Sequence, residues 1–187
     1  DEACVEDATR LGPLEVYGES KLIGEGLASA FCEETGIATT VLRFFNAIGR
    51  NETNPHVIPH IFESLQASDA IKLGNMAPKR DYIDTRDVAD AIVAAAESAR
   101  GFSVFNVGTG VACSVTEIVE LIGGILGRPI TVVGEPSRMR ATERMLLLAD
   151  IGKIGSATGW APKIRLRDTL KELVAPYGLQ SEPSSAL

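Results

Sequence analysis

Helical segments alternate with short strand patterns along most of this chain, and this alternation limits the fold to the α/β class. Residues 14–35 predict a helix that ends at Gly36 as its C-cap. Residues 37–45, rich in β-branched and aromatic side chains, predict a buried strand, followed by a loop at 46–55. Further helices are expected at 56–68, 88–99, 115–126, 150–158 and 166–177, and strands at 70–73, 81–83, 102–107 and 129–133.

Composition excludes several classes of protein. The 187 residues are 45% hydrophobic and 23% charged, which permits one domain with a hydrophobic core, or part of a larger one. The net charge is −7 without a block of Lys or Arg, so nucleic acid is not an expected partner. The apolar runs are too short for a membrane span, and no signal peptide opens the sequence. We therefore expect a cytoplasmic protein.

Metal binding has little support in the sequence. The three cysteines, Cys4, Cys32 and Cys113, lack metal-ligand spacing and indicate reduced thiols. His56 and His60 have the spacing of a helical zinc pair, but a proline lies between them and no acidic residue follows promptly. No metal site is expected.

Tyr17 and Lys21 stand four residues apart near the start of the first predicted helix, so they share one face. A phenol with a pKa of ~10 is a poor base at neutral pH. An ammonium at ~5 Å and an effective dielectric of ~20 favours the phenolate by ~3 kcal/mol, or ~2 pKa units. The pair can thus transfer protons near neutral pH. An exposed Tyr and Lys on an amphipathic helix is the alternative.

Ordered sequence blocks connect this pair with a known family. They are Tyr17-Gly-Glu-Ser-Lys21-Leu-Ile-Gly-Glu25, Leu42-Arg-Phe-Phe-Asn-Ala-Ile-Gly49, Arg80-Asp-Tyr-Ile-Asp-Thr-Arg-Asp-Val-Ala-Asp-Ala91, Phe105-Asn-Val-Gly-Thr-Gly110 with Ser114-Val115, Leu148-Ala-Asp-Ile-x-Lys153 and Gly159-Trp-x-Pro-Lys163. Together they resemble the C-terminal half of an extended short-chain dehydrogenase/reductase that acts on nucleotide sugars. UDP-glucose 4-epimerases, NDP-sugar dehydratases and GDP-4-keto-6-deoxymannose reductases are the similar enzymes, and the resemblance covers nearly all of residues 13–177.

The resemblance implies the C-terminal part of a Rossmann-like doubly wound sheet plus a small α/β substrate-binding subdomain. Residues 1–49 would end the dinucleotide-binding domain, 50–180 would bind the nucleotide sugar, with returning Rossmann elements at about 84–110, and 181–187 would form a tail. The Gly-rich phosphate loop and the catalytic Ser or Thr of the family are missing from the sequence. We expect a natural or engineered fragment, or a chain whose partner half lies elsewhere.

For catalysis, the resemblance implies that Tyr17 is the acid/base on the sugar hydroxyl or keto oxygen. Lys21 would hold the nicotinamide ribose and lower the Tyr17 pKa, and Phe44 would lie beside the nicotinamide of NAD or NADP. Core packing explains Phe44 equally well.

For the substrate, a nucleotide-diphosphate sugar, Asn46 matches the family residue near the diphosphate, although a turn role is the alternative. His56-Val57 replaces the Asn-Leu of many epimerases. Ile71 and Leu73 match the strand that lines the base, and an ordinary edge strand explains them as well.

Charged residues complete the implied site. Arg80 matches an arginine that grips the diphosphate, and Arg140 with Glu143 fits the family's Arg-x-x-Asp, in which the arginine binds phosphate and the acid binds ribose hydroxyls. Glu143 departs from that pattern, and a salt-bridged loop is the alternative. Asp84 and Asp87 suggest a helix cap rather than catalytic acids, as Ser114 and Glu117 suggest a capping box.

Three functions remain open. The first is an NAD(P)-dependent nucleotide-sugar epimerase, the second a GDP- or dTDP-deoxysugar reductase or dehydratase, and the third a non-catalytic nucleotide-sugar-binding module. The family commonly dimerises through the helix of the Tyr-Lys pair. Leu22, Ile23 and Leu27 offer an apolar face for such a homodimer, or they pack inward on the sheet.

Overall fold

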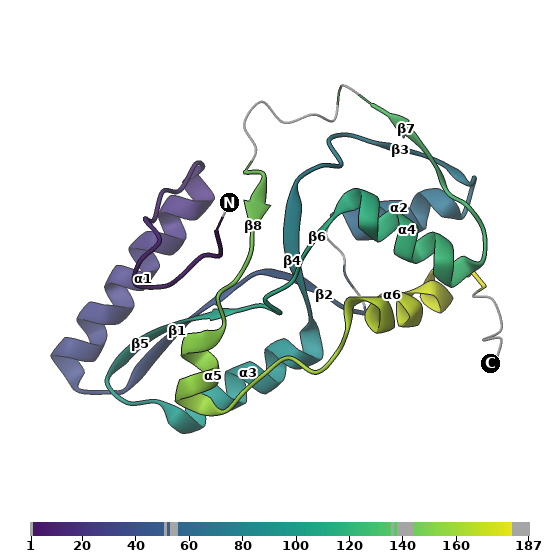
Figure 1. Ribbon diagram of the computed structural model, residues 1–187. Helices are drawn as coiled ribbons and strands as arrows, with labels where there is room; N and C mark the ends of the chain where they lie inside the picture. The colour runs from purple at the N-terminus through teal and green to yellow at the C-terminus, as the bar shows by residue number, and fades with distance from the viewer. Residues whose placement is uncertain (1, 51, 53–55, 136, 138–143, 181–187) are drawn as a thin grey trace.

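A computed structural model describes residues 2–50, 52, 56–135, 137 and 144–180. One end of the molecule is a parallel strand pair, β1 (Thr39–Phe44) and β5 (Phe102–Val107), in which Arg43 is opposite Asn106. Helix α1 (Val16–Thr35) lies on one side of this pair, and α3 (Thr85–Ser98) with α5 (Gly152–Thr158) lies on the other (Figure 1). This layered arrangement confirms the α/β class.

The other end is a second, mainly helical layer. Helices α2 (Val57–Leu65), α4 (Val115–Leu126) and α6 (Leu166–Val174) pack near a parallel pair formed by β3 (Ala70–Leu73) and β7 (Thr131–Gly134) (Figure 1). Their apolar faces form one buried cluster, centred on side chains such as Phe62, Ile118 and Leu170. A smaller cluster under β1 and β5 contains Phe105, Ile154 and Trp160.

Strand β4 (Lys79–Asp84) connects the two layers. It pairs in parallel with β2 (Asn46–Ile48) and β8 (Leu146–Leu147), and antiparallel with β6 (Ala112–Ser114). Successive side chains of a strand point to opposite faces. Tyr82 therefore enters the larger cluster while its neighbour Ile83 enters the smaller one.

Several local predictions are confirmed. Gly36 ends α1 in the left-handed region with φ of 71°, as a C-cap glycine does. Ser114 and Glu117 form the expected capping box at the start of α4. The prediction of a loop at 46–55 is wrong in part, because Asn46–Ile48 forms β2. Strands β6 and β8 were not expected from the sequence. Each of these three strands is short and takes its partner, β4, from a distant part of the chain.

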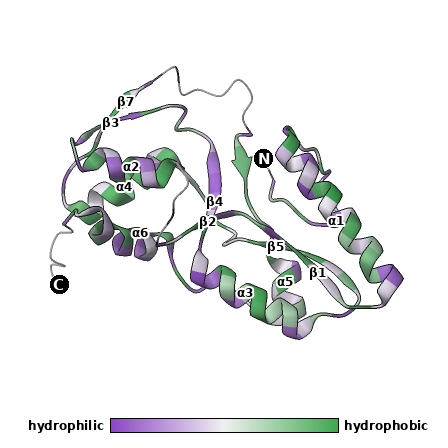
Figure 2. Cartoon of the chain, turned by 180° about the vertical axis from the view of Figure 1, so that it is seen from behind, coloured by the Kyte–Doolittle hydropathy of each residue, from purple (hydrophilic) through white to green (hydrophobic). Residues whose placement is uncertain are grey.

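The outward side of α1 is unusually apolar for an exposed surface. Only Cys32 of this helix is buried, whereas Val16, Ile23 and Leu27 are 85%, 63% and 67% exposed. Figure 2 shows the corresponding stretches of green along α1. Ile23 and Leu27 therefore point away from the sheet. Within the described part of the chain, α1 included, no helix has the length and apolar character needed to cross a bilayer.

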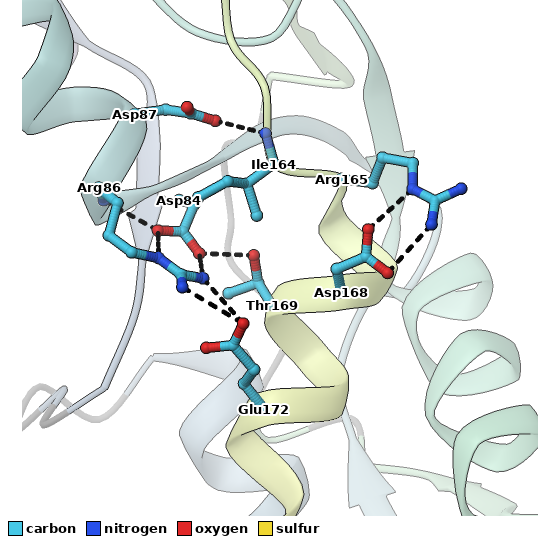
Figure 3. A network of polar contacts seen from close by, with 8 residues as sticks. All are labelled: Asp84, Arg86, Asp87, Ile164, Arg165, Asp168, Thr169 and Glu172. Carbon is cyan, nitrogen blue, oxygen red and sulfur yellow. Dashed lines mark hydrogen bonds and ion pairs between the residues drawn. The ribbon is translucent and has the colours of Figure 1, made fainter. Parts of the chain in front are cut away.

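Two carboxylates at the start of α3 hold the C-terminal segment in place (Figure 3). Asp84 caps α3 by accepting from the Arg86 N–H at 2.8 Å, and it also accepts from the Thr169 hydroxyl of α6 at 2.7 Å. Asp87 instead accepts from the backbone N–H groups of Lys163 and Ile164 at 2.9–3.1 Å. The capping role is thus confirmed for Asp84, and Asp87 is an anchor for an incoming segment.

Asp84 gives the fold a specific acid sensitivity. Burial tends to raise the pKa of this carboxyl group, but hydrogen bonds from Arg86 and Thr169 outweigh burial and lower its pKa to about 2. A depressed carboxyl pKa stabilises the fold above the unfolded pKa, and this stabilisation disappears as pH falls through the folded pKa. We expect Asp84→Asn to lower the unfolding free energy at pH 7 by on the order of 1–2 kcal/mol.

The measurement is urea unfolding of the chain and of Asp84→Asn between pH 7 and pH 2. The difference between them is expected to be constant above about pH 5 and to shrink between about pH 4 and pH 2. Glu117, whose pKa is also lowered to about 2, titrates in both proteins and cancels. A difference that does not change with pH would contradict a charge-based role for Asp84.

A third carboxylate, Asp81 of β4, organises the turn at Gly108-Thr109-Gly110. It is fully buried and accepts from the N–H and hydroxyl of Thr109, from the Gly110 N–H, and from the Ala149 N–H, at 2.7–3.3 Å. A Cβ on Gly108 would lie 2.6 Å from the Ala149 Cβ and 2.7 Å from an Asp81 oxygen. Glycine is required at 108 because the carboxylate and its neighbours approach the backbone this closely.

Candidate active site

Tyr17 and Lys21 lie in the first turns of α1, and the structure brings their side chains together. The Lys21 ammonium is 5.2 Å from the centroid of the Tyr17 ring, within the range of a cation–π contact. Tyr17 is 72% exposed, so its hydroxyl is open to solvent. The loop before α1 packs closely against the first turn of the helix, because a Cβ on Gly18 would lie 2.8 Å from the Cβ of Pro13.

A cavity of about 900 Å³ opens beside this pair. Its walls come from the N-terminal segment between Cys4 and Pro13, from α1, and from the chain between Arg43 and Ala47. Lys21, Phe44, Asn46 and His56 all line it, which brings together four of the residues proposed from the sequence. Tyr17 lies one helical turn before Lys21 on α1 but is not part of the lining.

An ion pair between α1 and β1 lines this first cavity. The Arg43 guanidinium donates from Nε to Glu25 Oε1 at 2.8 Å and from Nη2 to Glu25 Oε2 at 2.7 Å. Both side chains are only about 20% exposed. On the sheet, Arg43 lies opposite Asn106, whose backbone N–H donates to Glu6 Oε1 at 2.7 Å.

A second cavity, of about 530 Å³, adjoins the first. The two share Asn46, Ala47, Glu52 and His56, which form a common boundary between them. His56 Nδ1 is 3.6 Å from Glu52 Oε1. The far part of the second cavity is lined by a set from β3, β4 and α2 that includes Val57, Leu73, Arg80 and Tyr82.

Ile71, which was proposed from the sequence, lines neither of these cavities. Its side chain is 1% exposed and belongs to the larger hydrophobic cluster. Arg140 and Glu143 lie outside the described residues. Their roles stay predictions.

The structure also shows polar residues that sequence reasoning did not assign to the site. Glu25 and Arg43 lie in two of the family blocks, but the sequence predicts no role for either, and Glu52 lies in a predicted loop. The spacing of Lys21 and Glu25 on one helix face is a signal that was available. The contact of Glu25 with Arg43, however, depends on how α1 lies on β1, and no local pattern gives that.

The arrangement can bind a long, anionic ligand and transfer a proton at one end. Lys21 supplies a cation at the first cavity and Arg80 supplies one at the second. Guanidinium and ammonium groups bind phosphate oxygens through charge-assisted hydrogen bonds. The described residues contain no group of three or more His, Cys, Asp or Glu side chains placed to hold a metal ion.

Comparisons with known proteins place this chain in a class and then in a family. The layered α/β fold is shared with MoeE5, whose solved structure contains UDP-glucuronic acid and NAD, at a TM-score of 0.80 and 29% identity over 91% of this chain and 57% of that one. UDP-glucose 4-epimerase of Thermotoga maritima, solved with UDP-glucose, gives a TM-score of 0.80 at 29% identity over 89% and 54%. The class is that of the Rossmann-like α/β proteins. The chain belongs to the NAD dependent epimerase/dehydratase family, whose sequence model matches residues 2–108.

Curated relatives include both epimerases and reductases. GDP-6-deoxy-D-mannose reductase of Pseudomonas aeruginosa is 27% identical over 88% of this chain and 56% of its own length. UDP-glucose 4-epimerase of Corynebacterium glutamicum is 32% identical over 81% of this chain and 50% of its own length. The chain thus spans about half the length of the curated relatives it matches.

Proposed function

We propose that this chain carries the substrate-binding and proton-transfer part of an NAD(P)-dependent nucleotide-sugar epimerase. The observation that carries the proposal is that the two cavities lie side by side and share lining residues. Lys21 and Phe44 line the first, Arg80 and Leu73 line the second, and Asn46 lines both. A sugar beside Tyr17, a diphosphate at the shared boundary and a base near Leu73 would occupy this sequence of surfaces in order.

In this mechanism Tyr17 acts at the sugar. Its phenolate accepts the proton of a sugar hydroxyl while the carbon that bears the hydroxyl becomes a carbonyl, and it returns the proton when the opposite face is reduced. The Lys21 ammonium, 5.2 Å from the centroid of the Tyr17 ring, would offset the negative charge on Tyr17 during the proton transfer. When bound, the nicotinamide cofactor supplies the hydride acceptor and donor. Phe44, half exposed at the first cavity, offers an apolar surface to a flat ring.

The residues present fit one end of such a cofactor. A ring and ribose can lie between Phe44 and Lys21, which line the same cavity. The Gly-rich turn that receives a dinucleotide pyrophosphate does not occur in the sequence. Catalysis therefore has to be tested in a joined chain, in which a family cofactor-binding half precedes Asp1.

A reductase or dehydratase of the same family is the second candidate, favoured by the relative that is named a GDP-deoxysugar reductase. A non-catalytic nucleotide-sugar-binding module is the candidate from another class. Absorbance of the nicotinamide band separates them when the joined chain is mixed with NAD(P) and NDP-sugars. Transient reduction with sugar isomerisation supports the epimerase, and net consumption of NAD(P)H supports the reductase. Nucleotide binding with no absorbance change would refute both enzymes.

Arg80 gives a test of the nucleotide site in the chain as it stands. Arg80→Ala is expected to weaken binding of UDP or GDP by about 1.5–3 kcal/mol, because a charged hydrogen bond to phosphate is lost. Isothermal titration calorimetry measures this directly.

Arg100→Ala is the matched control. Arg80 and Arg100 each donate from Nη1 to the carbonyl of the preceding residue, at 2.9 and 2.7 Å, but Arg100 lies just after α3 and lines neither cavity. Equal loss of affinity in the two variants, or no loss with Arg80→Ala, would remove Arg80 from the proposed site.

We also propose that the apolar side of α1 forms a homodimer contact. Ile23 and Leu27 are each more than 60% exposed and lie one turn apart on that side. Sedimentation equilibrium of the joined chain tests this, and a monomer at micromolar concentration would contradict it.

A further inference from the structure

Lys21 and Glu25 have the sequence spacing at which opposite charges on a helix often form an ion pair. They are four residues apart on α1, and both line the first cavity. Opposite charges at this spacing lie within reach of each other on a helix surface. A carboxylate bound to Lys21 would neutralise the ammonium that the proposed mechanism needs beside Tyr17.

In the structure Glu25 is turned to a different cation. Both of its oxygens accept from Arg43 of β1, at 2.7 and 2.8 Å. Lys21 lies over the Tyr17 ring, and within the described ranges it forms no ion pair.

Two features favour Arg43 over Lys21 as the partner of Glu25. A guanidinium matches both oxygens of a carboxylate at once, whereas an ammonium acts as a single point charge. Arg43 is also fixed in place, because it lies within β1 and opposite Asn106 of β5. An ion pair of Glu25 with Lys21 would involve an exposed ammonium, and exposed ion pairs contribute little to stability.

The charges around Arg43 reinforce this choice. The hydrogen bond to Glu25 raises the pKa of Arg43 more than burial lowers it, and the carboxylates of Glu25, Glu6 and Asp7 raise it further. Glu6 is 8% exposed, and its Oε2 is buried without a hydrogen-bond partner in the described structure. Arg43 therefore faces acidic groups from both α1 and the N-terminal segment.

We propose that Arg43 is a positioning residue that sequesters Glu25 and so keeps the Lys21 ammonium available to Tyr17. Its catalytic consequence rests on the proposed function. The change of partner itself does not, and it can be measured in the chain without any cofactor.

The first experiment measures how fast Lys21 is acylated by a small amine-reactive ester, with the exposed Lys72 of β3 as the internal reference in peptide mass spectrometry. Arg43→Gln releases Glu25 to pair with Lys21, which keeps this amine protonated. We expect acylation of Lys21 to slow by about threefold to tenfold, since a neighbouring opposite charge favours the charged form. Glu25→Gln with Arg43→Gln is expected to restore the original rate.

Arg165→Gln is the matched control, because Arg165 also donates twice to a carboxylate, Asp168, at 2.8 and 3.2 Å far from Lys21. It is expected to leave Lys21 acylation unchanged. If Arg43→Gln does not fold by circular dichroism, Arg43→Lys replaces it, and a partial slowing is expected because an ammonium holds Glu25 less completely.

The second experiment measures the turnover of the joined chain as a function of pH. Arg43→Gln is expected to move the acidic limb of the pH–rate profile for kcat upward by about one pH unit, and the double variant is expected to return it. KM should change little, because neither side chain is assigned to substrate.

The outcomes separate the two proposals. A double variant as slow in acylation as Arg43→Gln would overturn sequestration and leave Arg43 as a structural contact between α1 and β1. Unchanged acylation in Arg43→Gln would overturn it as well. The expected acylation pattern in a joined chain without turnover would uphold sequestration and refute the proposed enzyme.

Discussion

Tyr17→Phe in the joined chain is expected to lower kcat by about 10²- to 10⁴-fold, the usual contribution of general acid–base catalysis. The substitution removes one hydroxyl from a side chain that is 72% exposed, so the fold has no buried partner to lose. Binding of UDP or GDP is expected to stay within about twofold, because Tyr17 does not line the second cavity.

The measurement pairs turnover, followed at the nicotinamide band, with calorimetry of nucleotide binding. Tyr177→Phe is the control that removes the same hydroxyl elsewhere. Its ring stacks on Phe62 at 5.1 Å between centroids, and it lines neither of the two cavities. Parallel loss of turnover and binding in Tyr17→Phe would show that Tyr17 supports structure rather than proton transfer.

The largest effect on stability is expected from Asp81→Ala. This carboxylate is fully buried and accepts four hydrogen bonds, three of them from backbone N–H groups. Alanine leaves these donors without an acceptor inside the protein, and each orphaned group costs about 1–3 kcal/mol. We expect the free energy of unfolding to fall by about 3–5 kcal/mol, at the upper end of single substitutions.

Urea unfolding followed by far-ultraviolet circular dichroism tests this expectation. Asp90→Ala is the control, because Asp90 is a 55% exposed carboxylate that, among the described residues, pairs with the Lys163 ammonium alone, at 3.0 Å. An exposed pair of this kind contributes less than about 1 kcal/mol. Similar losses in both variants would mean that burial of Asp81 has no special importance.

The parts of the fold that depend on neighbours in sequence were predictable. Gly36, the Ser114–Glu117 capping box and the β-branched run before Phe44 each act within a few residues, and each predicts its element correctly. Strands β6 and β8 escaped prediction because their stability comes from pairing with β4, which is far away in sequence. Asp87 shows the same limit, since its partners follow 76 and 77 residues later.

The candidate site divides in the same way. Tyr17 and Lys21 were predicted from helix spacing, and the family resemblance added Phe44, Asn46, His56 and Arg80, all of which line one or both cavities. Ile71 could not be separated from Leu73 in advance, because both have the β-strand pattern and both are buried in the larger cluster, and only the tertiary structure shows that Leu73 also lines the second cavity. The ion pair of Glu25 with Arg43 could not be predicted, because it depends on how α1 packs on β1.

The segment between Trp160 and α6 has a consequence for how the protein unfolds. It starts in the smaller hydrophobic cluster at Trp160, is fixed by Asp87 and Asp84, and ends in the larger cluster at Leu170. β4 likewise contributes to both clusters. Because β4 and the segment from Trp160 to Leu170 both join the two clusters, neither region can unfold separately without breaking buried polar contacts. The protein should therefore behave as one cooperative unit, although its sequence suggests a dinucleotide-binding part and a substrate-binding part.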